Sequence, residues 1–288
     1  MRLLYMELLK MMENNEIFSQ SELIIRNYIL NQKENIMNLT VKEIASINYV
    51  SKSTLIRFAQ KLGFDGWNSF KVYFLKELDI EKKNISGVDY NFPFSPDDSP
   101  SFITKKLLVM KRDILDDTFN LLDISSLNKA LELMLSKDRI HIFAEGYSNL
   151  ASNDFCHRMT RIGKFVTNSN KLGMSYIAKT LSPKDLAIIV SYSGKTKKIL
   201  EVAMLLKQNR IPTISITKRE DNPISEISNV TLFVPSKENI YSKISNYSTT
   251  DSIRFILDIL FSMYFNKNFN TNLNTRVSLA KIVDKKID

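Results

Sequence analysis

The sequence predicts an all-α helix-turn-helix domain followed by an α/β domain built on a doubly wound parallel sheet of about five strands. Three observations predict this arrangement. Helical periodicity dominates the first 85 residues, three prolines interrupt the chain within residues 91–100, and apolar strand-like segments alternate with helical segments from residue 139 onward. We therefore divide the 288 residues into a helical domain over 1–85, a linker over 86–104 and a second domain over 105–288.

Composition places the chain among globular proteins. Apolar residues make up 44% and charged residues 25% of the sequence, which excludes global disorder. The longest aliphatic run, residues 186–190, is far shorter than the ~20 residues that a membrane span needs. The single cysteine, Cys156, excludes an internal disulfide. We therefore expect a cytoplasmic protein that does not contact a membrane.

The first part of the helical domain carries two helix signals. Apolar residues recur at helical spacing over residues 19–31, which predicts an amphipathic helix. Thr40 and Glu43 have the spacing of a capping box, in which each side chain binds the backbone amide of the other residue. This box predicts a short helix that starts after Thr40 and ends near Ile47.

A second short helix follows after about three residues. Ser51 is a favoured N-cap residue, and Gly63 is a favoured C-cap residue, so the helix is predicted over residues 52–62. Its apolar stripe leaves the charged side chains on the other side of the helix. Two short helices joined in this way form a helix-turn-helix, whose second helix reads the major groove of DNA.

The second helix of this pair supplies the candidate DNA contacts. Residues 40–76 carry six Lys or Arg and two Asp or Glu, a local net charge of +4, whereas the overall charge of +9 is spread along the whole chain. The pattern alone also fits a helical pair on a solvated surface, or a docking surface for another protein. The residues that can reach bases or phosphates are Ser51, Lys52, Ser53, Thr54, Arg57 and Lys61.

The second domain alternates strands and helices. Strands are predicted over residues 139–144, 164–167, 186–190, 213–217 and 230–234. Helices are predicted between and after them, over residues 148–162, 172–180, 196–209 and 249–266. This alternation predicts an open parallel sheet with helices on both faces, and ligands of such sheets bind beyond the carboxyl ends of the strands.

Two of these strand ends carry hydroxyl-rich loops that lead into helices. The first strand is followed by residues 144–148 (AEGYS), and the third by residues 191–196 (SYSGKT). Free amides at a helix N-terminus favour an anion, serine and threonine hydroxyls add donors, and Gly194 permits close approach of the backbone. The pattern predicts a phosphate site, although ordinary N-capping by these hydroxyls is the alternative.

The helical pair resembles the helix-turn-helix of the RpiR/MurR-type bacterial sugar regulators. The family pattern V-S-x-x-T-V-x-R-F-x-x-K-L-G-F is matched except that Leu55 replaces the second valine. The usual turn glycine falls at Tyr49, so either Asn48 adopts the left-handed conformation or the turn has a different geometry. The matching residues are Val50, Ser51, Thr54, Arg57, Phe58, Lys61, Leu62, Gly63 and Phe64.

The second domain resembles the sugar isomerase (SIS) domain, which binds phosphosugars in enzymes and in regulators. Its loop S-x-S-G-x-T is matched over residues 191–196, and its first loop, G-x-G-x-S, is matched except that Ala144 replaces the first glycine. The resemblance implies that serine and threonine hydroxyls hold the phosphate, and Glu238 beyond the last strand is a candidate contact to the sugar. The candidate ligand residues are Gly146, Ser148, Ser191, Ser193, Gly194, Thr196 and Glu238.

The two resemblances together imply a transcription regulator of sugar metabolism. Its expected partners are double-stranded operator DNA, a sugar-phosphate effector and further copies of itself, as a homodimer or homotetramer, with the apolar helix 249–266 as a candidate interface. We expect no cofactor, no metal and no catalytic residue. The alternative is a phosphosugar isomerase or related enzyme, for which Glu145 and Glu238 are the available carboxylates near strand ends.

Overall fold

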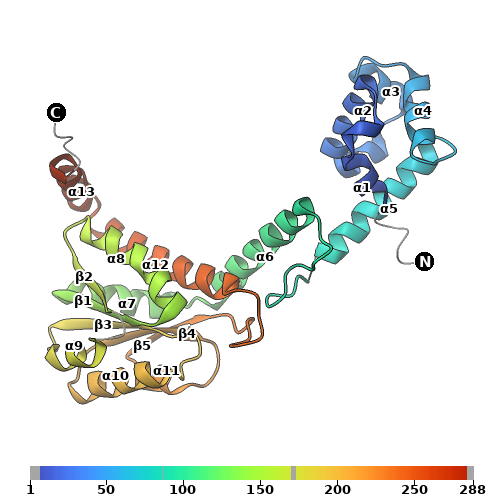
Figure 1. Ribbon diagram of the computed structural model, residues 1–288. Helices are drawn as coiled ribbons and strands as arrows, with labels where there is room; N and C mark the ends of the chain where they lie inside the picture. The colour runs from blue at the N-terminus through green and yellow to red at the C-terminus, as the bar shows by residue number, and fades with distance from the viewer. Residues whose placement is uncertain (1–6, 86, 170–172, 284–288) are drawn as a thin grey trace. The chain divides into compact units, whose positions relative to one another are not determined.

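The computed structural model describes residues 7–85, 87–169 and 173–283 of the chain. Contacts within the chain divide it into two compact units, Met1–Val88 and Asp89–Asp288 (Figure 1). Each unit has a hydrophobic core of its own, so each is built around its own set of apolar side chains.

The N-terminal unit is helical, as predicted. Its core includes Phe58, Phe70 and Phe74, whose neighbouring ring centroids lie 5.7 Å apart. Leu55 and Phe58 of the second short helix point into this core, so the polar face of that helix lies on the surface. The elements of this unit are α1 (Glu7–Glu13), η2 (Asn15–Ile17), α2 (Gln20–Gln32), η3 (Lys33–Asn38), α3 (Val41–Ile47), α4 (Lys52–Lys61) and α5 (Trp67–Ile85).

The caps of the helix-turn-helix are confirmed. The left-handed residue of its turn is Tyr49 and not Asn48. The Thr40–Glu43 capping box starts α3, and the Ser51 side chain caps α4 by accepting a hydrogen bond from the amide of Thr54. Asn48 does not adopt the left-handed conformation, because its φ is −98°. Tyr49 itself adopts it, with a φ of +54°, so the turn keeps the backbone of a glycine turn with a tyrosine in place.

The segment between the units is shorter than the linker predicted over 86–104. Turns and extended backbone occupy residues 87–99, and α6 (Pro100–Leu121) starts inside the predicted linker. Pro100 stands in the first turn of α6, where proline needs no amide partner and its fixed φ suits a helix, and the Ser99 side chain caps the helix. The proline that helps to predict the linker is therefore also the start of a helix.

The C-terminal unit contains a five-stranded sheet in which every neighbouring pair is parallel, with strand order β2-β1-β3-β4-β5. The strands are β1 (Arg139–Ala144), β2 (Phe165–Ser169), β3 (Asp185–Val190), β4 (Thr213–Lys218) and β5 (Val230–Val234). The helices are α6, α7 (Ile124–Ser136), α8 (Gly146–Thr160), α9 (Met174–Thr180), α10 (Lys197–Gln208), α11 (Pro223–Ile227), α12 (Tyr247–Lys267) and α13 (Phe269–Val283). The predicted doubly wound α/β class is confirmed.

Helices cover both faces of the sheet (Figure 1). One face packs against α7, α8 and α12, and the other packs against α9, α10 and α11. The apolar residues of α12 are buried in the core of their own unit: Ile253, Ile256, Leu257 and Leu260 are at most 1% exposed. Other apolar residues of α12, among them Ile259, Phe261 and Phe265, are only half-buried, so an interface between copies at residues 249–266 stays a prediction.

The strand order places a switch point between β1 and β3. The chain leaves β1 toward β2 on one side and leaves β3 toward β4 on the other, so the loops after β1 and β3 separate there. Ala144 and Val190, the last residues of these strands, are register partners, so the two loops begin side by side. In the described part of the chain, no helix combines the length and the apolar character that crossing a bilayer requires.

Candidate functional site

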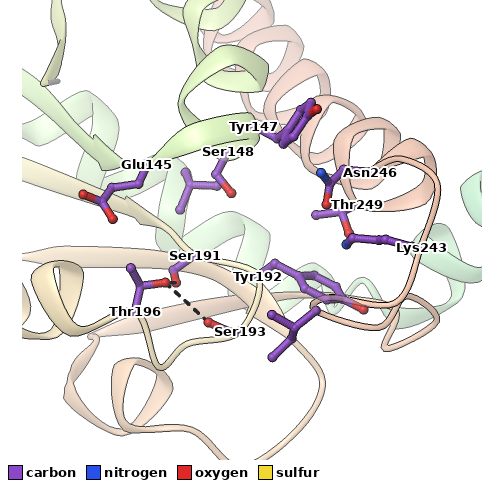
Figure 2. Close-up of a pocket in the computed structure, with 12 residues that line it drawn as sticks. Glu145, Tyr147, Ser148, Ser191, Tyr192, Ser193, Thr196, Lys243, Asn246 and Thr249 are labelled. Carbon is purple, nitrogen blue, oxygen red and sulfur yellow. Dashed lines mark hydrogen bonds between the residues drawn. The ribbon is translucent and has the colours of Figure 1, made fainter. Parts of the chain in front are cut away.

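A cavity of about 180 Å³ opens at the switch point between β1 and β3. Its walls come from the loop after β1, the loop after β3, and the segment from Ile240 to the first turn of α12 (Figure 2). The sequence predicts a ligand at the first two of these loops, and the structure brings them together in one pocket. The lining residues are Glu145, Tyr147, Ser148, Val190, Ser191, Tyr192, Ser193, Thr196, Ile240, Lys243, Asn246 and Thr249.

Three helices start at this pocket. The N-cap residues of α8, α10 and α12 are Glu145, Thr196 and Asn246, and all three residues line the cavity. None of these three side chains makes the usual capping hydrogen bond to its own helix. The first-turn amides of α8 and α10 are therefore not satisfied by their caps, and together with the helix dipoles they favour an anion in the pocket.

The hydroxyls of the loop after β3 form a cluster at the start of α10. The Thr196 hydroxyl lies 3.3 Å from that of Ser191 and 3.4 Å from that of Ser193 (Figure 2). Ser193 also accepts a hydrogen bond from the amide of Lys195 at 3.2 Å. Each hydroxyl can rotate to donate toward the cavity, so this cluster can bind several oxygens of one phosphate. Ser148 faces it from the first turn of α8 (Figure 2).

Gly194 is the residue that lets this loop pass close to its neighbour. Its φ is +62°, and a Cβ built on it would lie 2.1 Å from Oδ1 of Asn222. Asn222 is buried and caps α11, so it has no room to move away. Gly194 therefore acts through the backbone, and Gly146, with a φ of +54°, likewise shapes the start of α8; neither glycine is among the lining residues.

The opposite wall carries a buried ion pair. The ammonium group of Lys243 lies 3.0 Å from a carboxylate oxygen of Glu238 and 5.6 Å from the centre of the Tyr192 ring. Burial raises the pKa of Tyr192 to about 12, so its hydroxyl stays protonated and donates to the carbonyl oxygen of Glu238 at 2.9 Å. This wall therefore presents polar groups whose formal charges already balance.

Glu238 corrects one of the predicted ligand contacts. Its side chain is fully buried and is not part of the pocket lining. The carboxylate accepts hydrogen bonds from the backbone amides of Ser248 and Thr249 and from the Thr249 hydroxyl, in addition to pairing with Lys243. Glu238 thus satisfies the N-terminus of α12 from behind the pocket wall, because a carboxylate there replaces the missing N-cap bond.

The segment that precedes α6 holds the same wall from outside. The Asn91 side chain accepts a hydrogen bond from the amide of Asn239 at 2.6 Å, and its carbonyl oxygen accepts one from the amide of Ile244 at 2.8 Å. These two bonds bracket Ile240 and Lys243, which line the pocket. Asn91, near the start of the C-terminal unit, is therefore attached directly to the ligand-facing loop.

The N-terminal unit presents the polar face of α4 to solvent. Lys52, Ser53 and Arg57 are exposed there, as the DNA-binding prediction requires. The Ser51 hydroxyl is engaged as the helix cap and lies 2.7 Å from the hydroxyls of both Ser53 and Thr54. At the start of α4, Ser51, Lys52 and Ser53 are exposed and Thr54 is half-buried.

Lys61 is committed to a different partner. Its ammonium group forms a 2.7 Å ion pair with Glu22 of α2. Burial raises the pKa of Glu22, but the hydrogen bonds from Lys61 and Ser19 outweigh this effect and leave the pKa below its usual value. The Lys61 side chain is still 41% exposed, so it links α4 to α2 while its contact to DNA stays a prediction.

Seven of the twelve lining residues are not singled out from the sequence. Val190, Tyr147 and Tyr192 lie within or beside the loops already singled out, so their proximity follows once the loops are placed. Ile240, Lys243 and Asn246 come from the segment without regular periodicity between β5 and α12, and Thr249 lies in the first turn of α12. The only signal for this segment is its position after the carboxyl end of a strand.

Comparison with known proteins gives matches over most of the chain. Residues 5–81 match the helix-turn-helix domain of the rpiR family, and residues 133–263 match the SIS domain. An HTH-type transcriptional regulator of Clostridium perfringens is 30% identical over 261 residues, which cover 89% of this chain and 91% of that protein. One from Haemophilus influenzae is 28% identical over 251 residues and 85% of each chain.

Solved structures share the fold. The NanR protein of Vibrio vulnificus in complex with ManNAc-6P aligns over 96% of this chain and 97% of its own, with a TM-score of 0.59 and 22% identity. The sugar isomerase domain of an RpiR transcription factor from Sphaerobacter thermophilus covers 61% of this chain and 97% of its own, with a TM-score of 0.55 and 15% identity.

Proposed function

Because the chain belongs to the RpiR family of helix-turn-helix transcription regulators, we propose that its N-terminal unit binds operator DNA through α4 and that a sugar phosphate bound in its C-terminal unit changes this binding. The regulator acts in the cytoplasm as a homodimer or homotetramer, so that two copies of α4 meet the two halves of a palindromic site. Lys52, Ser53 and Arg57 are exposed and are the principal proposed DNA contacts.

The observation that carries the proposal is the convergence of two incompletely capped helices and a hydroxyl cluster on one pocket. An anion placed between the starts of α8 and α10 meets backbone amides from both helices and the hydroxyls of Ser148, Ser191, Ser193 and Thr196. Phosphate has the charge and the number of oxygens to use these donors together. NanR, the fold relative described above, was solved with a phosphorylated sugar, ManNAc-6P.

The remaining wall favours an uncharged sugar ring beyond the phosphate. Lys243 and Glu238 neutralise one another, so this wall does not attract a second anionic group. Asn246, Thr249 and Lys243 offer hydrogen bonds to hydroxyl or amide groups. We therefore assign the effector to the monophosphates of neutral sugars, with the phosphate at α8 and α10 and the ring toward α12.

Regulation is favoured over isomerisation by the composition of the pocket. Isomerisation of a sugar phosphate needs a base near the reacting carbons and a group that opens the ring. Among the described lining residues, Glu145 is the one carboxylate, since Glu238 is buried behind the wall. His141 is buried on β1, where it bonds Thr167, and it is not a lining residue. The pocket thus offers binding groups without an evident acid–base pair.

Capture of genomic DNA tests the first half of the proposal. The purified full chain is incubated with fragmented DNA of the source organism, and the retained fragments are sequenced. We expect a few palindromic sites to be enriched, and we expect Lys52→Ala/Arg57→Ala to lose them. Lys129→Ala/Lys207→Ala removes the same charge from exposed positions of the C-terminal unit and serves as the control that keeps them. Equal retention by all three proteins would contradict the proposed DNA surface.

Operator affinity with and without sugar phosphates tests the second half. A panel of hexose and N-acetylhexosamine 6-phosphates is added to the complex, with the unphosphorylated sugars and inorganic phosphate as controls. We expect one sugar phosphate to change the operator affinity, and Ser193→Ala to require a higher concentration of it. Turnover of any of these compounds would instead support the enzyme alternative.

A further inference from the structure

The turn of the helix-turn-helix is closed by an unusual residue. After α3, the amide of Tyr49 bonds the carbonyl oxygen of Ser46, and the amide of Val50 bonds that of Ala45. This pair of bonds is the Schellman motif, whose closing residue adopts the left-handed conformation and is usually glycine. Tyr49 occupies that position with a φ of +54°.

The same unit contains a matched example with the expected residue. After α4, the amide of Gly63 bonds Gln60 and the amide of Phe64 bonds Ala59, which is the same motif. Its closing residue is Gly63, with a φ of +87°. The same motif after α10 is closed by exposed Arg210, with a φ of +55°, so a side chain at this position is disfavoured by its Cβ but occurs elsewhere in the chain.

Packing does not explain the tyrosine. Tyr49 is 97% exposed, so its ring contributes almost nothing to the core of the unit. The ring lies two residues before Ser51, the cap of α4, and therefore at the end of α4 that carries exposed Lys52 and Ser53. An almost fully exposed aromatic side chain beside the exposed polar residues of α4 is available to contact a partner of this unit.

We propose that Tyr49 is a DNA contact whose hydroxyl donates a hydrogen bond to a phosphate at the edge of the major groove that receives α4. This inference rests on the proposed function. A side chain that precedes the reading helix lies at the rim of the groove, where the sugar-phosphate backbone runs, and tyrosine hydroxyls are regular phosphate donors. A neutral donor of this kind positions the helix without displacing a counterion.

Two variants at this position separate the contact from a structural role. Tyr49→Phe removes only the hydroxyl and leaves the turn unchanged, so we expect it to weaken DNA binding about tenfold, on a captured site and on a random duplex alike. Tyr49→Gly should weaken binding at least as much, while its unfolding temperature stays equal or rises because the disfavoured conformation is relieved. If the role of Tyr49 were purely structural, Tyr49→Gly would lower the unfolding temperature and would not weaken DNA binding through a lost contact.

The salt dependence identifies the type of contact. Affinities are measured over a series of salt concentrations for the full-length native chain, Tyr49→Phe and Lys52→Ala. The slope should fall by about one for Lys52→Ala and stay unchanged for Tyr49→Phe. Tyr176→Phe, at an exposed position of the C-terminal unit, is the control that should bind like the native chain.

The outcomes are distinguishable. Native affinity of Tyr49→Phe overturns the hydroxyl–phosphate contact while leaving the proposed function intact. Failure of the native chain to retain any DNA overturns the proposed function and this inference together. Loss of affinity in Tyr49→Phe with an unchanged salt slope supports the assignment.

Discussion

Replacement of Glu238 by glutamine tests the structure of the pocket wall. The carboxylate accepts four hydrogen bonds: its Oε2 from Lys243 at 3.0 Å and from the Thr249 hydroxyl at 2.6 Å, and its Oε1 from the amides of Ser248 and Thr249. Glutamine keeps only one of the two accepting oxygens and places an NH₂ donor where the other stood. At the Oε1 position the new donor faces two backbone amides, and at the Oε2 position it faces the Lys243 ammonium group while the Thr249 hydroxyl can turn to accept from it. In either orientation Lys243 loses its counter-charge.

The size of the effect follows from burial. The Glu238 side chain is fully buried and that of Lys243 is 9% exposed, so little water can replace the lost acceptor. Breaking one partner of a buried pair costs about 3–5 kcal/mol, and we take about 3 kcal/mol because Lys243 borders the open pocket. For a unit of this size, 1 kcal/mol lowers the melting temperature by about 2–4 °C, so we expect a decrease of about 9 °C.

Thermal unfolding of the full chain without ligand measures this effect. The transition of the C-terminal unit is followed by calorimetry for the native chain, Glu238→Gln and Glu132→Gln. Glu132 is an exposed residue of α7, so its variant should stay within about 0.5 kcal/mol of the native chain. An unchanged melting temperature for Glu238→Gln, with weaker sugar-phosphate binding, would refute the structural role and restore the ligand contact predicted from sequence.

Three further perturbations address the two binding surfaces and the acid stability of the sheet. Arg57→Ala should weaken operator binding about 10–100-fold and lower the salt slope by about one, without changing effector affinity in calorimetry; loss of both would contradict the assignment. Ser193→Ala should weaken the sugar phosphate about tenfold and leave effector-free DNA binding intact, whereas unchanged affinity would exclude this hydroxyl. Burial raises the pKa of Asp185, but hydrogen bonds from Arg139 and Ser182 outweigh it and hold the pKa below its usual 3.8. Its stabilising effect is therefore present above pH 3.8 and lost as the pH falls below it, so the acid unfolding curve should be shallower for Asp185→Asn.

Local signals in the sequence were sufficient for much of the fold. The strand predicted over 186–190 differs from β3 by one residue, because a run of aliphatic side chains is stable only when it is buried on both faces of a sheet. The capping box at Thr40 and the cap at Ser51 depend on residues three positions apart, so they too can be read without tertiary information. The helices α6 and α7 were not predicted, although α6 starts at the proline that marks the linker.

Tertiary contacts decided the roles of several individual residues. Glu238 follows a strand end, as a ligand residue would, but the start of α12 folds back over it and takes its carboxylate. Lys61 lies on the expected face of α4, yet Glu22 from a distant helix pairs with it. Glu22 is 39 residues from Lys61, and the partners of Glu238 are reached only because the irregular segment before α12 turns back, so no local sequence pattern indicates either contact.

The sequence by itself determined the order of the two units, the class of each, and the two hydroxyl-bearing loops, because periodicity, caps and strand ends are properties of neighbouring residues. Only the tertiary structure decided that the starts of α8, α10 and α12 converge on one cavity and that Lys243 is neutralised within its wall. It also decided which residue bears the left-handed turn, Tyr49. These features depend on the register of β1 with β3 and on the packing of chain segments that are far apart in sequence. Contacts between such segments are not visible in the pattern of neighbouring residues.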